Sequence, residues 1–118
     1  EWPWVYQKEA ANYRNFLYGV DGVLYPPHCL HPDVLDIETA MKLCPKADDI
    51  WFWLQAVRAG TKIYSIPGYF APLHTNPMRQ LNFNDDGTLC IENEFYFNEE
   101  QFQKVYGAYP DFMAKLLE

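Results

Sequence analysis

The chain has 118 residues, of which 49% are hydrophobic and 21% are charged, and its formal net charge is −7. This composition is typical of one folded domain, or part of one, and not of a disordered chain. The nine Lys and Arg residues are scattered along an acidic chain, which argues against a nucleic acid partner. No apolar run is long enough for a transmembrane segment, and no signal peptide is visible.

Aromatic residues make up 18% of the chain, which favours either a bulky core or stacking surfaces for sugar-like ligands. The three cysteines, Cys29, Cys44 and Cys90, have wide and irregular spacing. This spacing indicates neither a zinc site nor a disulfide framework, so we expect reduced thiols and a cytoplasmic protein. The opening residues, "EWPWVYQKEAANYRNF", contain no initiator Met and resemble the middle of a protein, so we expect an excised piece of a longer chain.

The first predicted elements are an irregular or helical stretch over 5–17 and a turn in "GVDGVLYPP" (19–27). Residues 23–25 are strand-like, and two prolines end that strand because neither can donate to a ladder. A helix is expected to start with Pro32 in its first turn and to stop at Pro45. Its apolar positions at helical spacing are Val34, Ile37, Met41 and Cys44.

A second helix follows, with Asp48 or Asp49 as its N-cap and Gly60 as its C-terminal cap. "TKIYSI" (61–66) alternates polar and apolar residues, which predicts a strand, and residues 74–88 are loop-like. The tail is expected to be helical from Asn98, with a break at Tyr109-Pro110. The apolar face predicted for the second helix consists of Ile50, Trp53, Leu54 and Val57.

These elements predict the α/β class, with few short strands and about four helices in a single domain over residues 1–118. A sheet of two or three strands is thin for a complete enzyme, which again indicates a piece of one.

Two segments carry a resemblance to a known family. "YGVDGVLYPPHCL" is similar to the "G-x-GG-x-LYPP" turn of certain bacterial polysaccharide and lipopolysaccharide glycosyltransferases, and "CPKADDIWFWLQAVRAGTKI" is similar to their "C-x-x-ADD-x-W" helix start. A fainter third segment is "NEEQFQKVYGAYPDF". In this order, the segments resemble the C-terminal, acceptor-side portion of a nucleotide-sugar glycosyltransferase with a GT-A-type fold.

The resemblance implies transfer of a hexose from a nucleotide-sugar donor to a glycan or lipid-linked acceptor. Such a reaction needs a base for the acceptor hydroxyl, and the family's acidic pair implies Asp49 in this role with Asp48 in support. A helix N-terminus favours the ionised carboxylate, while a neighbouring carboxylate and apolar walls oppose it. The other interpretation is an ordinary N-cap, and one aspartate can serve as cap while the other acts as base.

The candidate substrate-binding residues lie in the same two segments. Gly19 and Gly22 allow the backbone to approach a sugar or the donor phosphates, although a tight turn alone would also explain them. Asp21 occupies a position where the family usually has glycine, which puts the substrate contact of this turn in doubt. Tyr25 and Trp51 are candidates for stacking on a sugar ring, whereas Trp53 lies on the predicted buried face.

Metal binding is not expected in this chain. The family's Asp-x-Asp, which holds the donor diphosphate through a divalent metal, belongs to its N-terminal half, and Asp48-Asp49 and Asp85-Asp86 lack the intervening residue. The resemblance therefore implies Mn²⁺ or Mg²⁺ only in the full-length enzyme. His74, in a loop, is expected to be an exposed histidine and not a metal ligand.

The isolated chain is expected to be inactive and, through exposed apolar surface, to favour a homodimer across the face that its missing half would cover. The parent protein is expected in the cytoplasm, at the inner face of the membrane. The alternative is a non-catalytic module that binds a carbohydrate or a protein partner through its aromatic residues.

Overall fold

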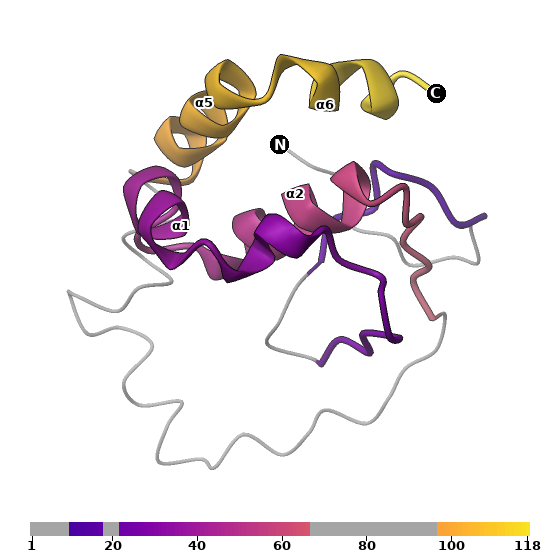
Figure 1. The fold of residues 1–118 in the computed structure, drawn as a ribbon. Helices are drawn as coiled ribbons and strands as arrows, with labels where there is room; N and C mark the ends of the chain where they lie inside the picture. Colours follow the sequence, from indigo (N-terminus) through magenta and orange to yellow (C-terminus); the bar gives the residue numbers. More distant parts are fainter. Residues whose placement is uncertain (1–9, 18–21, 67–96) are drawn as a thin grey trace, which may run out of the picture.

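The fold is built around one central helix, α2 (Asp48–Arg58) (Figure 1). The structure, a computed structural model, describes residues 10–17, 22–66 and 97–118. A 3₁₀ turn, η2 (Pro32–Leu35), and helix α1 (Ile37–Leu43) precede α2. Helices α5 (Asn98–Ala108) and α6 (Pro110–Leu116) follow it and form an arch along α2.

Helix α2 carries the core of the described residues. Its predicted apolar face is confirmed, because all four residues of that face are at most 1% exposed (Ile50, Trp53, Leu54 and Val57). Trp53 is fully buried, and its ring lies edge-on to Phe112 with centroids 4.9 Å apart. Burial of rings of this size contributes about 2–3 kcal/mol each. The aromatic run after the two aspartates is mainly core, because Trp51 and Trp53 are both buried.

The C-terminal end of α2 is closed by Gly60, as predicted. Gly60 has φ +78°, and its N–H donates to the Val57 carbonyl at 2.9 Å. The next N–H, of Thr61, donates to the Ala56 carbonyl at 2.9 Å, which completes a Schellman motif. A glycine is preferred here because other residues adopt this left-handed backbone at a cost.

The helix predicted to run continuously from Pro32 to Pro45 is interrupted at Asp36. The Asp36 carboxylate accepts hydrogen bonds from the Thr39 N–H at 3.1 Å and from the Thr39 hydroxyl at 2.6 Å, so α1 starts anew at Ile37. These two bonds lower the pKa of Asp36. The predicted apolar face is wrong in its middle, because Ile37 is 65% and Met41 59% exposed.

The C-terminal helices agree with the prediction. Helix α5 begins at Asn98, Tyr109 separates the two helices, and Pro110 occupies the first turn of α6. The side chains that these helices bury against the core are Gln101, Val105, Phe112 and Leu116.

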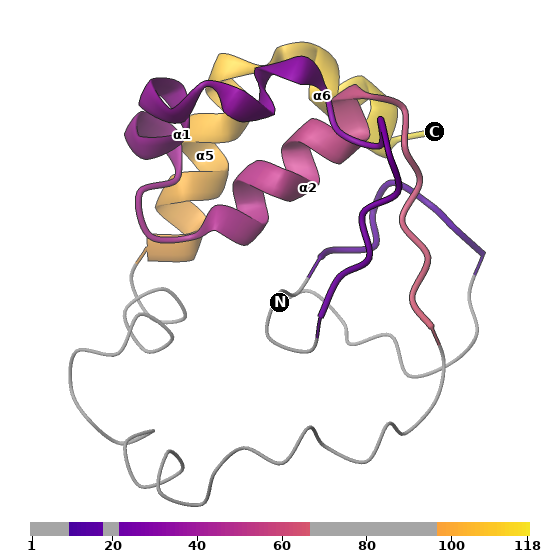
Figure 2. The same ribbon diagram turned by 60° about the horizontal axis from the view of Figure 1, so that its bottom comes forward.

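No strand occurs in the ranges that the structure describes, so the predicted strands over 23–25 and 61–66 are wrong and the α/β class is not confirmed there. Within 61–66, Ile63 pairs with Asn12 in an isolated antiparallel bridge. The bridge does not extend because the Asn12 side chain accepts the N–H groups of Arg14 and Asn15, both at 2.8 Å, and so bends the chain away. Residues 22–30 and 61–66 form neither helix nor strand, and they run side by side in Figure 2.

Candidate functional site

The two aspartates that open α2 lie in its first turn and do not cap it. The N-cap position is Ala47, which makes no side-chain cap bond, so the predicted N-cap role of Asp48 or Asp49 is wrong. Asp48 is exposed, Asp49 is half-buried, and the Asp48 carboxylate accepts the Asp49 N–H at 3.1 Å. Both carboxylates therefore lie at the positive end of the α2 dipole.

Tyr25 joins this helix start from the "LYPP" segment. Its ring packs on Phe52 with centroids 5.7 Å apart and planes inclined by 47°. Burial raises the pKa of Tyr25, and the carboxylates of Asp49 and Asp48 raise it further, so both charges act on its hydroxyl. The structure therefore brings together the two sequence segments on which the family resemblance depends.

A tight turn directly follows Tyr25. The Cys29 N–H donates to the Pro26 carbonyl at 3.2 Å, and His28 between them has φ +64°. Proline followed by a residue with positive φ is the pattern of a type II turn. The Thr61 hydroxyl donates to the Cys29 carbonyl at 2.7 Å, which attaches this turn to the segment that follows α2.

The other predicted substrate-binding residues do not join Tyr25 in a common site among the described residues. Gly22 is exposed with φ +96° and no atom within 4 Å of where a Cβ would stand, so its backbone conformation explains the glycine. Gly19 and Asp21 lie outside the described residues. Trp51 is only 3% exposed and its indole N–H donates to the Val34 carbonyl at 3.2 Å, so it packs in the core and presents no ring to the surface.

Phe52 is the site residue that the sequence reasoning missed. It lies four residues after Asp48 and three after Asp49, and residues at these spacings share a helix face. That spacing was the available signal, because Phe52 has it from both aspartates whereas Trp51 has it from Asp48 alone.

The residues described do not supply a metal centre. No group of three or more His, Cys, Asp or Glu side chains is arranged there to hold a metal ion. Cys29 and Cys44 are free thiols, and burial raises the pKa of Cys44 to about 12, which makes it unreactive. His74 and Cys90 lie outside the described residues.

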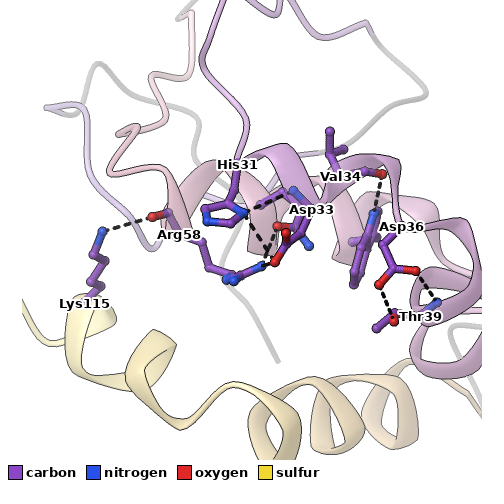
Figure 3. A network of polar contacts seen from close by, with 9 residues as sticks. His31, Asp33, Val34, Asp36, Thr39, Arg58 and Lys115 are labelled. Carbon is purple, nitrogen blue, oxygen red and sulfur yellow. Dashed lines mark hydrogen bonds and ion pairs between the residues drawn. The ribbon is translucent and has the colours of Figure 1, made fainter.

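A second polar cluster lies at the opposite end of α2 and holds the fold together (Figure 3). Arg58 donates to the Asp33 carboxylate at 2.9 Å, and His31 accepts the Asp33 N–H at 3.2 Å. The Arg58 guanidinium also lies 4.5 Å from the centroid of the Tyr109 ring. These contacts join η2, α2 and the start of α6, so we interpret the cluster as structural.

The chain shows no match to any protein-family model, curated protein or solved structure. Among the described helices, none has the length and apolar character needed to cross a membrane.

Proposed function

We propose that the chain is the acceptor-side part of an α/β glycosyltransferase of GT-A type, which transfers a hexose from a nucleotide-sugar to a hydroxyl of a glycan or lipid-linked acceptor. The observation that supports the proposal is the contact between Tyr25 and Phe52 beside Asp48 and Asp49. Each of the two motifs alone is weak support for the family, and a contact between their side chains makes the support stronger.

In the proposed mechanism, the Asp49 carboxylate accepts the proton of the acceptor hydroxyl as that oxygen bonds to the anomeric carbon. The bond between the anomeric carbon and the diphosphate oxygen breaks, and the nucleoside diphosphate leaves with the electron pair. The helix N-terminus stabilises the carboxylate before transfer, and the adjacent Asp48 charge favours arrival of the proton. The half-buried position of Asp49 suits a base better than the exposed position of Asp48.

Donor and metal binding are not assigned to this chain. The sequence lacks an Asp-x-Asp, and the described residues contain no group of three or more His, Cys, Asp or Glu that could hold Mn²⁺ or Mg²⁺.

The second candidate is a non-catalytic module that binds carbohydrate or protein. The surface position of Tyr25, 39% exposed beside Phe52, favours it, since exposed aromatic rings also suit simple binding. The two candidates differ in turnover, because only a transferase consumes the donor.

The decisive experiment measures transfer by the natural protein that contains this chain, over a panel of nucleotide-sugars with Mn²⁺ or Mg²⁺. We expect Asp49→Asn to lower kcat by about 100-fold or more, because loss of a general base typically costs that much. Asp48→Asn should have a smaller effect. Asp111→Asn is the matched control, since Asp111 is an exposed aspartate in the first turn of another helix, α6.

Unchanged turnover by a folded Asp49→Asn variant would remove Asp49 as the base. Absence of both transfer and donor hydrolysis in the wild type would favour the binding module.

A further inference from the structure

We propose that the acceptor group bound beside Asp49 is the pyranose ring of a neutral sugar, held against the Tyr25–Phe52 pair, and not a lipid phosphate. This inference rests on the proposed function and narrows its acceptor class. It assigns Phe52 as a positioning residue for the acceptor.

The first support is the shape of the aromatic pair. Tyr25 is 39% exposed and Phe52 is half-buried, so both rings reach the surface, with planes inclined by 47°. A pyranose has an apolar C–H face that packs on aromatic rings and a polar edge of hydroxyls.

The second support is the position of the carboxylates relative to the rings. Phe52 follows Asp48 and Asp49 by one helical turn, so the polar and apolar groups share one face of α2. Carboxylates accept hydrogen bonds from sugar hydroxyls, whereas they repel a phosphate or a uronic acid at the same distance. A sugar whose C–H face lies on the rings can therefore present a hydroxyl to Asp49.

The third support is that the pair is held before any ligand arrives. The Pro26–Cys29 turn fixes the residue next to Tyr25, and the Thr61 hydroxyl anchors that turn at 2.7 Å. Phe52 is also fixed, because it packs against the core from within an 11-residue helix. A site with little freedom to lose on binding holds a small ligand more tightly.

The test compares acceptor kinetics of the natural protein with Phe52→Leu, which keeps an apolar side chain at the core but removes the ring. We expect the KM for a neutral oligosaccharide acceptor to rise roughly tenfold while the donor KM stays unchanged. Phe52→Tyr, which keeps an aromatic ring, should have the wild-type acceptor KM. Tyr64→Leu is the control, since Tyr64 is 45% exposed and lies next to the Asn12–Ile63 bridge, on a different segment.

An unchanged acceptor KM in Phe52→Leu, with turnover that still depends on Asp49, would overturn the inference while leaving the proposed function intact. A polyprenyl phosphate or a uronic acid that outperforms the neutral acceptor would also overturn it. If the wild type transfers nothing, the proposed function fails. Titration of the protein with the same neutral oligosaccharide then decides whether the Tyr25–Phe52 pair binds a sugar. Binding that Phe52→Leu weakens would support the aromatic site, and absence of binding would overturn it.

Discussion

Replacement of Gly60 by alanine gives a clean test of how α2 ends. The new Cβ would meet only the Lys115 Nζ at 3.7 Å, an ordinary contact, so the cost comes from the backbone at φ +78°. The left-handed conformation costs a residue with a Cβ about 1–2 kcal/mol. Alanine also reduces the freedom of the unfolded chain, which returns roughly 0.5 kcal/mol. We therefore expect a net loss of about 1 kcal/mol.

Gly107→Ala is the matched substitution with the opposite expected sign. Gly107 lies in α5, and nothing stands within 4 Å of its would-be Cβ. Alanine at a helical position is favoured over glycine by about 0.5–1 kcal/mol. Urea unfolding followed by circular dichroism measures both, and the m-value should not change. Equal shifts for the two variants, or a Gly60→Ala protein as stable as the wild type, would refute the reasoning.

Two further predictions concern the buried side chains. Trp53→Phe should lower the free energy of unfolding by about 2–3 kcal/mol, because it removes ring volume and leaves the Tyr13 carbonyl without the indole N–H at 3.0 Å. A change below about 1 kcal/mol in urea unfolding would contradict this contact. Burial raises the pKa of Cys44 from 9.0 to about 12, so above pH 9 the unfolded chain loses this proton before the folded one does. The contribution of the Cys44 thiol to the free energy of unfolding is fully present below pH 9 and is lost as the pH rises toward 12. In urea titrations at several pH values, Cys44→Ala should make this loss of stability smaller. A slope unchanged in Cys44→Ala would mean that other groups cause it.

Local sequence signals predicted the helices of the described residues well. Gly60 marks the end of α2 because glycine tolerates the left-handed backbone that this position needs, and Pro110 marks the start of α6 because proline fixes its own φ. The Asp36 break was also readable in principle, since Asp followed three residues later by Thr39 can form a cap within the apolar pattern. The strands over 23–25 and 61–66 were wrong for a different reason. A strand needs a partner ladder, and alternation in one segment does not reveal whether that partner exists.

The candidate site was predicted in part. The sequence placed Asp48, Asp49 and Tyr25 in the two motifs but chose Trp51 as the aromatic neighbour. Trp51 is buried because α2 is covered on more than one side, by η2 as well as by α5 and α6. A helix sequence shows which residues share a face but not how many faces are covered.

The contact between α2 and α6 has a consequence for how the protein is made. Lys115 donates to the last carbonyls of α2, those of Val57 at 3.2 Å and Arg58 at 3.3 Å, and Phe112 closes over Trp53. The central helix is therefore synthesised before α5 and α6, the two helices that follow it and pack on it. Until residue 115 leaves the ribosome, the part of α2 that α6 covers stays exposed, and exposed apolar surface of this kind favours aggregation of a nascent chain.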